Sequence, residues 1–454
     1  MGITMSRMRF WILFLFFLTI GFSAWADESG AKPLYVGWAS VDITPPEPVA
    51  LVGQLHKRIS QGVRDPLTAT ALALETWDAE GNREQAILVS CDILYILRSV
   101  QRRVQNEIRA RIPGFDPEKL FLNATHTHTG PGYNDAAFHN LYDVSNDPGV
   151  MKADDYADIF VDRVTQAAVE AWNNRKRGGM SWALSHAVVG MNRRARYFDG
   201  TAVMYGKVNQ ENFSHIEGYE DHGVPLLFFW TPEQECTGVL INIACPSQET
   251  EGLSVVSADF WHDVRLELRR RLGPNLFVLP QCAAAGDQSP HYLLRAQAEQ
   301  IMRERRGLDS RQEIARRIAN AVEDGFSLAR QDIQSDLVFK HTVARFPVPP
   351  HTDQTAPFYL TDPINPIECH ILRLGDIAMC TAPFELYLDY SLRVQARSPA
   401  VLTFVVQLAC QHSGYLPTER AVQGGGYSAD KFIVGPEGGQ RWVEETLKAI
   451  KALW

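Results

Sequence analysis

Asn123-Ala124-Thr125-His126-Thr127-His128-Thr129-Gly130-Pro131-Gly132 is the stretch around which the rest of this chain is best interpreted. The apolar residues 120–122 lead into it and predict a strand. In extended backbone, side chains two residues apart point the same way, so His126 and His128 can both face one site. The Gly-Pro-Gly that follows predicts a sharp turn. Neutral imidazole is the commonest metal ligand, although two structural histidines bonding loop backbone would produce the same pattern.

The composition is that of an ordinary globular protein. The chain has 454 residues, of which 45% are hydrophobic and 21% charged, enough for a large buried core. A formal charge of −9 argues against a nucleic-acid partner, which would need a basic face. We see neither repeats nor a clear linker, and therefore expect one domain over residues 27–454.

Residues 1–26 have the pattern of a signal peptide. Arg7 and Arg9 precede an apolar run over residues 10–22, which is too short to span a bilayer comfortably. Ala24-Trp25-Ala26 fits a small-x-small cleavage site. We expect cleavage after Ala26 and a secreted or periplasmic protein, the alternative being an uncleaved membrane anchor.

The cysteines do not form a disulfide framework. Their number is odd, their spacing is wide, and most lie in apolar strand-like runs, which favours buried free thiols with room for one bridge. They are Cys91, Cys236, Cys245, Cys282, Cys369, Cys380 and Cys410.

Strand-like and helix-like segments alternate along the chain. This alternation predicts an α/β fold, and a hairpin over residues 367–380 through Gly375 predicts mixed sheets flanked by helices. The predicted helices cover residues 99–112, 153–173, 258–272, 296–331 with an interruption near Gly307, the segment after Glu385, and 436–453.

Five of the predicted strands end in small or polar residues. Ligands in α/β folds gather at the carboxyl ends of strands, so these ends are candidates for one site, although they could equally be unrelated loops. They lie at His126/His128, Cys245/Gln248, Asp287/Ser289, Glu385 and Tyr415.

Two further features leave alternatives open. Asp92 ends an apolar run, where a carboxylate is either a ligand or a hydrogen-bonded structural group. Arg193 or Arg194, in a polar turn, could bind an anionic or carbonyl group or belong to a surface salt-bridge cluster.

Taken together, the motifs over residues 34–453 resemble the catalytic domain of neutral, non-lysosomal ceramidases. Tyr415 and Tyr427 also keep that family's spacing. The matching stretches are Gly-x-x-x-x-Asp-Ile-Thr-Pro-Pro at 37–46, Val89-Ser90-Cys91-Asp92, the two-histidine turn, Asn192-Arg193, Gly286-Asp287-Gln288-Ser289-Pro290, Pro383-Phe384-Glu385 and Gly414-Tyr415-Leu416-Pro417-Thr418.

The resemblance implies a zinc ion as cofactor and assigns residues to it. Family zinc ligands are two histidines, a glutamate and a tyrosine, of which His126, Glu385 and Tyr415 match three. His128 matches a residue that assists the reacting water or carbonyl. The residues that match positions around the scissile amide are Arg193, Ser289 and Tyr427, and Arg193 and Tyr427 are candidates for oxyanion stabilisation.

The chain departs from the family in two places. The family's second zinc histidine is missing from the turn Ala244-Cys245-Pro246-Ser247-Gln248. Cys245 as a thiolate, Gln248 or His262 could replace it, and a buried inert thiol is equally compatible with the pattern. We expect Cys245 or Gln248, rather than His262, nearest the missing position. We also expect residues 27–454 to lack the C-terminal Ig-like domain of long ceramidases.

These features predict an exported zinc-dependent amidohydrolase. It would cleave an N-acyl amide, such as a ceramide-like lipid, to a fatty acid and an amine, with His128 handling the proton; a lipid substrate would bring it to a membrane surface. A serine hydrolase using Ser289 is an alternative, but Gly-Asp-Gln-Ser-Pro is not a G-x-S-x-G elbow. A non-catalytic binding protein that has lost its metal is another.

Overall fold

The computed structural model describes residues 30–77, 80–133, 141–351, 364–430 and 432–454. The predicted signal peptide, residues 1–26, lies outside this part of the chain. Within it, no helix combines the length and the apolar character needed to cross a bilayer.

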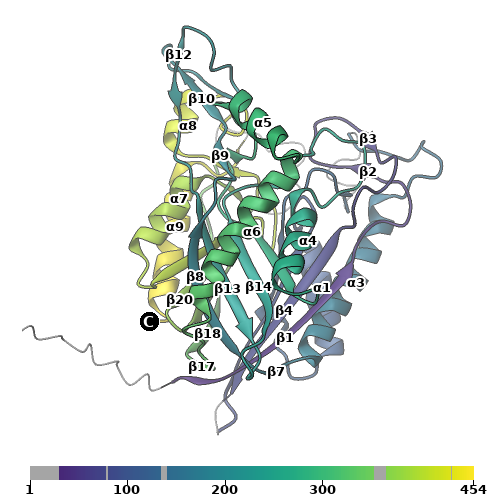
Figure 1. Cartoon of the computed structure of the whole chain (residues 1–454), viewed down its shortest axis with the longest axis vertical. Coiled ribbons are helices and arrows are strands. Elements are labelled where there is room, and N and C mark those ends of the chain that lie inside the picture. The colour runs from purple at the N-terminus through teal and green to yellow at the C-terminus, as the bar shows by residue number, and fades with distance from the viewer. Residues whose placement is uncertain (1–29, 78–79, 134–140, 352–363, 431) are drawn as a thin grey trace, which may run out of the picture.

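Three larger β-sheets meet around a shared apolar core, as expected for an α/β fold with mixed sheets (Figure 1). The core joins Phe121 and Leu72 from the first sheet, Leu227 from the second, and Leu372 and Phe404 from the third, all fully buried. The strand order of the first sheet is β17 (Asp336–Leu337), β1 (Lys32–Asp42), β4 (Thr68–Trp77), β5 (Arg83–Cys91) and β6 (Leu120–Ala124). That of the second sheet is β15 (Phe277–Cys282), β14 (Cys236–Ile243), β13 (Gly223–Trp230) and β8 (Gly179–His186). That of the third sheet is β18 (Phe339–Phe346), β19 (Ile367–Leu374), β20 (Ile377–Thr381) and β22 (Leu402–Val406).

Each sheet contains one parallel pair among antiparallel neighbours. The pairs are β5 with β6, β14 with β15, and β20 with β22. Parallel neighbours end at the same edge, so each sheet delivers two carboxyl ends to one place.

Backbone hydrogen bonds join these three edges into a closed ring. The Ala124 N–H donates to the Leu408 carbonyl, that of Ser247 to Thr125, and that of Gln407 to Cys282. The strand ends that the sequence marked as candidates therefore lie together.

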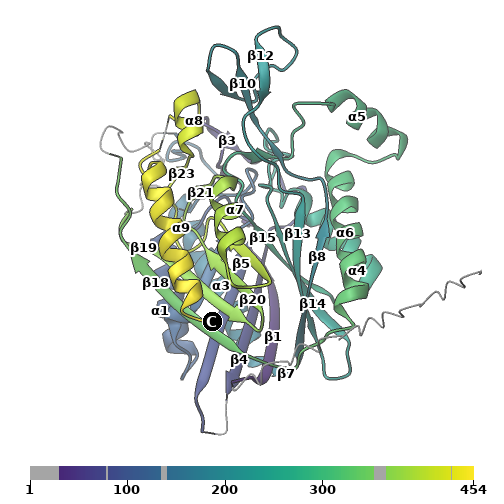
Figure 2. The ribbon, with the colours of Figure 1, turned by 90° about the vertical axis from the view of Figure 1, so that its left-hand side faces the viewer.

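Helices cover the outer face of every sheet (Figures 1 and 2). On the first sheet, Gly37 allows β1 and α3 to touch, because a Cβ there would lie 2.0 Å from the Ala171 carbonyl oxygen. The pairs of helices are α1 (Arg98–Arg111) with α3 (Ala153–Asn173), α4 (Phe260–Leu272) with α6 (Ser310–Ala329), and α7 (Leu388–Arg397) with α9 (Pro436–Lys451).

Short elements complete the fold. They are β7 (Lys176–Arg177), β2 (Ala50–Leu51) with β3 (Arg58–Ile59), β9 (Met191–Asn192) with β16 (Gln288–Ser289), β21 (Glu385–Leu386) with β23 (Tyr415–Leu416), a small sheet of β11 (Ala202–Met204), β10 (Arg194–Tyr197) and β12 (Phe213–Ile216), η1 (Pro117–Lys119), α5 (Ala296–Arg305) and α8 (Glu419–Gly424).

The structure decides between the alternative roles of Asp92 and Arg194, and shows the state of the cysteines. Asp92 is structural, because both its carboxylate oxygens bind the Arg265 guanidinium, at 2.7 and 3.0 Å. Arg194 is not on the surface: it is buried and pairs with Glu217 at 2.6 Å. All seven cysteines are free, and six of them are buried.

Candidate functional site

His126 lies just beyond the strand that leads to it. β6 ends at Ala124, and His126 has a φ of +67°, so the expectation of two histidines on one extended strand is wrong. Left-handed backbone turns the two rings nearly perpendicular, at 88° with centroids 4.8 Å apart, yet both still line one cavity.

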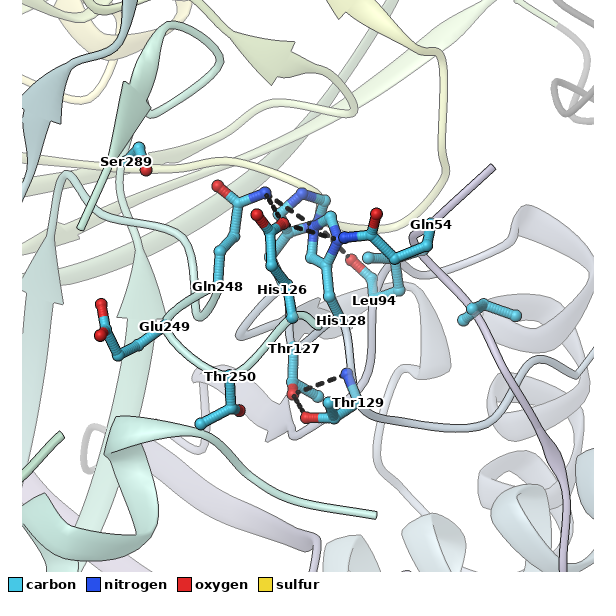
Figure 3. Close-up of polar contacts among 12 residues, drawn as sticks. Gln54, Leu94, His126, Thr127, His128, Thr129, Gln248, Glu249, Thr250 and Ser289 are labelled. Atoms are coloured by element: carbon cyan, nitrogen blue, oxygen red, sulfur yellow. Dashed lines mark hydrogen bonds and ion pairs between the residues drawn. The ribbon is translucent and has the colours of Figure 1, made fainter. Parts of the chain in front are cut away.

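Thr127 and Thr129, which alternate with the histidines, hold this turn in place (Figure 3). The Thr127 and Thr129 hydroxyls both donate to the Ser257 carbonyl, at 2.8 and 3.0 Å, and lie 3.1 Å from each other. Side chains alternate along the turn: the imidazoles line the cavity, and the hydroxyls bind the Ser257 carbonyl in the segment between β14 and α4.

The imidazole of His126 presents one nitrogen to a buried carboxylate. Its Nδ1 lies 2.7 Å from the Leu94 carbonyl, which can only accept, so Nδ1 carries the proton. The other ring nitrogen, Nε2, faces Glu385 Oε2 at 3.4 Å, where a protonated ring pairs with the carboxylate. Burial alone would raise the pKa of Glu385, but His126 and His412 hold that pKa well below its usual range. Glu385 is therefore an ionised carboxylate inside the protein.

Tyr415 is placed beside Glu385 by backbone pairing. The two residues face each other in the parallel register of β21 and β23. Both line a cavity of about 50 Å³ at the joined strand ends, whose wall includes His126, His128, Glu385, His412, Tyr415 and Tyr427. A larger cavity of about 590 Å³, next to Tyr292 and Arg317, contains none of the predicted site residues.

Arg193 supports this wall from behind. Its Nη2 donates to the Tyr415 hydroxyl at 3.3 Å and to the Gly286 carbonyl at 2.9 Å, and its Nη1 donates to Gln248 Oε1 at 3.2 Å. The side chain is 2% exposed. Arg193 thus orders other site residues and does not line the cavity.

The contact with Arg193 orients the Gln248 amide, and the amide in turn orients His128. Because the guanidinium occupies Oε1, the Gln248 NH₂ group points at His128 Nε2, 3.0 Å away (Figure 3). An NH₂ donor requires an acceptor there, which leaves the proton of His128 on Nδ1. The nearest acid to Nδ1 is Glu251, whose Oε2 lies 3.7 Å away.

His128 is neutral in this environment. Burial, and next the neighbouring His126 ring, lower the pKa of His128 well below its ordinary value. Gly53 packs against the ring with φ +103°, and a Cβ at that position would lie 2.6 Å from His128 Nδ1. The buried Arg58 fixes the same turn by donating to the His128 carbonyl at 2.7 Å.

Ser289 lies apart from the histidines (Figure 3). Its hydroxyl oxygen accepts from the Tyr205 hydroxyl at 3.0 Å and from the His291 backbone N–H at 3.1 Å. Among the described residues, no imidazole nitrogen hydrogen-bonds to it, so the base that a serine nucleophile requires is not in place.

The three residues that could replace the missing zinc histidine lie in different surroundings. The Cys245 thiol lies in the core of the second sheet, against the carbonyls of Val189 and Pro246, and burial raises its pKa well above normal. His262 lies on α4, away from the cavity wall. Gln248 is at the site, but Arg193 already occupies its oxygen.

A separate cluster of potential metal donors lies deeper in the third sheet. Glu368, His370 and Cys410 bring ligand atoms within 4.8 Å of one another. The Glu368 carboxylate already pairs with Arg102 at 2.7 Å and Arg345 at 2.8 Å, which disfavours a cation. This buried ion-pair network is better understood as structural.

Sequence reasoning missed His412, Glu251, Tyr205 and Arg58. His412 carried a usable signal, because it follows a strand that ends at the same edge as Glu385. The other three reach the site from loops, short strands and separate segments, for which spacing in the sequence contains no information.

The donor set fits zinc. Nitrogen and oxygen ligands, one imidazole with a fixed tautomer, one ionised carboxylate and one phenol are chemically appropriate. Two zinc bonds of roughly 2 Å at a tetrahedral angle would separate their donors by about 3.3 Å. His126 Nε2 and Glu385 Oε2 lie 3.4 Å apart.

Comparison with known proteins identifies the fold. No protein-family model and no curated protein sequence matches the chain. The solved neutral ceramidase from Pseudomonas aeruginosa superposes with a TM-score of 0.70 at 17% identity, covering 93% of this chain and 75% of that one. A structure described as a ceramidase complexed with C2 superposes at 0.69 and 16% identity, with the same coverage. The chain therefore has the α/β fold of the neutral ceramidases.

Proposed function

We propose that this protein is a zinc-dependent hydrolase of N-acyl amides. The observation that carries the proposal is the buried His126–Glu385 pair beside Tyr415 and His128, at the edge where all three sheets end. The shared fold with neutral ceramidases supports the same reaction class.

The residues around the cavity have separate roles in the proposed reaction. A zinc ion bound there would polarise the amide carbonyl and lower the pKa of water. His128 handles the proton through Nδ1, which lies 3.7 Å from Glu251 Oε2. Burial raises the pKa of Tyr427, so its phenol stays protonated and can donate to a developing oxyanion.

Arg193 has a different role from the one the resemblance implied. Its guanidinium is committed to Tyr415, Gln248 and Gly286, so we assign it as a positioning residue behind the site. Ser289, tied to Tyr205, orients the polar half of the substrate and forms no covalent intermediate.

The cavity walls favour an N-acyl lipid substrate. Leu55, Leu94, Tyr95 and Tyr142 are part of the lining, which suits an acyl chain. Leu55 is 55% exposed, which suits contact with lipid at the cavity mouth. We propose a ceramide-like amide as the substrate, an exported enzyme, and fatty acid and amine as products.

The decisive experiment measures fatty-acid release by purified protein, with zinc restored and after chelation. The substrates are N-acylsphingosine, N-acylethanolamines and N-acyl amino acids. We expect turnover that chelation removes and zinc restores. His128→Ala should reduce this turnover, and the half-buried His262→Ala should leave it unchanged. Folded, zinc-loaded protein inactive on the whole panel would support the non-catalytic alternative instead.

A further inference from the structure

We propose that His412 supplies a second imidazole to the zinc site, from the connection between β22 and β23. This inference rests on the proposed function, because it concerns the metal of that same site. It names a ligand that neither the two-histidine turn nor the Cys245 turn provides.

The position of His412 is the first reason. Its Nε2 lies 3.9 Å from Glu385 Oε1, while His126 Nε2 lies 3.4 Å from Oε2 of the same carboxylate. One buried carboxylate is thus flanked by two imidazoles, each on its own oxygen. Both histidines line the same cavity as Tyr415.

The second reason is that the ring is held in this orientation. His412 is 3% exposed and stacks on Tyr95, with centroids 4.5 Å apart and planes 5° from parallel. Its neighbour Ser413 donates through its backbone N–H to the Pro383 carbonyl at 2.8 Å, and Glu385 donates to Gly414 at 2.9 Å. The two segments are therefore clamped together on both sides of the carboxylate.

The third reason is that Gln248 and Cys245, two other candidates for the missing ligand, are engaged elsewhere. Zinc sites use three or four nitrogen, oxygen or sulfur ligands. Gln248 Oε1 is occupied by Arg193, and the Cys245 thiol faces the Val189 and Pro246 carbonyls. With His412, the cavity wall offers zinc a set of two imidazoles, a carboxylate and a phenol.

The test is zinc binding, without reference to turnover. Purified wild type, His412→Gln, His126→Gln and the control His262→Gln are compared by metal analysis and by competition with a chromophoric chelator. Circular dichroism and thermal unfolding establish that each variant is folded. X-ray absorption of the zinc-loaded wild type counts imidazole ligands directly, so the inference remains testable if His412→Gln does not fold.

We expect two imidazoles in the wild type and a zinc Kd at least about 100-fold weaker in His412→Gln, since loss of even an outer-shell partner costs 10–100-fold. His262→Gln should match the wild type. One imidazole, with unchanged affinity in folded His412→Gln, would overturn the role of His412 and leave the zinc enzyme standing. A wild type that binds no zinc would overturn both.

Discussion

Glu385 and Tyr415 face each other across the two-residue parallel pairing of β21 and β23, so backbone register alone sets a carboxylate beside a phenol. His126 reaches the same point from a different sheet. The centre is therefore defined by strand pairing and does not depend on the conformation of a single loop.

Replacing His126 should remove the metal. We expect about one zinc per chain in the wild type and little in His126→Ala, because the variant lacks the imidazole whose Nε2 lies 3.4 Å from Glu385 Oε2. Metal analysis of dialysed protein measures this, with His262→Ala as the matched control. Equal zinc in folded wild type and His126→Ala would refute the assignment.

Adding one methyl group at Gly53 should disturb His128. Gly53 has a φ of +103°, so an alanine there strains the backbone by roughly 1–2 kcal/mol. Its Cβ would also lie 2.6 Å from His128 Nδ1 and displace the ring. We expect lower thermal stability and reduced turnover. Gly252→Ala is the control, since a Cβ there meets nothing within 4 Å. Identical behaviour of the two variants would contradict the packing argument.

The hydroxyl of Tyr427 should matter for turnover. Tyr427→Phe removes one proposed oxyanion donor, and loss of such a donor costs roughly 10²–10³ in kcat in measured cases. Tyr219→Phe removes the hydroxyl of a tyrosine that is 59% exposed and should be neutral. The measurement is the kcat of both variants on the N-acyl amide that the wild type hydrolyses fastest. A similar kcat for the two variants would show that Tyr427 has no part in the mechanism.

Ser289→Ala separates hydrolysis at a metal centre from serine catalysis. We expect a raised KM and substantial remaining kcat, because the serine hydroxyl binds Tyr205 and has no imidazole base among the described residues. Mass spectrometry of the quenched wild-type enzyme should show no acyl group on Ser289. Complete loss of activity together with a trapped acyl-enzyme would establish the serine mechanism.

Stability should fall in acid partly through Glu368. Burial opposes its ionisation, but the His370 hydrogen bond and the Arg102 and Arg345 ion pairs lower the pKa of Glu368 to about 2. A folded-state pKa below the unfolded value near 4.5 stabilises the protein above pH 4.5, and this stabilisation disappears as pH falls toward 2.

Urea unfolding between pH 7 and pH 2 measures the effect. Glu368→Gln should be less stable at neutral pH and show a shallower acid decline, by on the order of 1–3 kcal/mol. The exposed Glu233→Gln should follow the wild-type curve. Parallel curves for wild type and Glu368→Gln would show that this carboxylate is not responsible.

Local patterns predicted the elements well where periodicity is strong. The helix expected over residues 153–173 is α3 with the same bounds, because its apolar face repeats at helical spacing over its whole length. The gap near Gly307 separates α5 from α6, as expected. β13 was not predicted, although it lies between β14 and β8 in the second sheet.

Side-chain directions at the strand ends were harder to predict. The left-handed φ of His126 cannot be read from its neighbours, since non-glycine residues rarely adopt it. The burial of Cys245 and the approach of His412 to Glu385 depend on how three sheets meet. Sequence spacing within any one segment contains none of that information.

The ring of backbone bonds that links Ala124 to Leu408, Ser247 to Thr125, and Gln407 to Cys282 has a consequence for how the protein matures. The segments it joins are far apart in the chain, and contacts of large sequence separation form slowly in folding. Zinc should therefore enter late in refolding, after the sheets have docked. A ligand that binds only the native state then stabilises the finished molecule without accelerating its assembly.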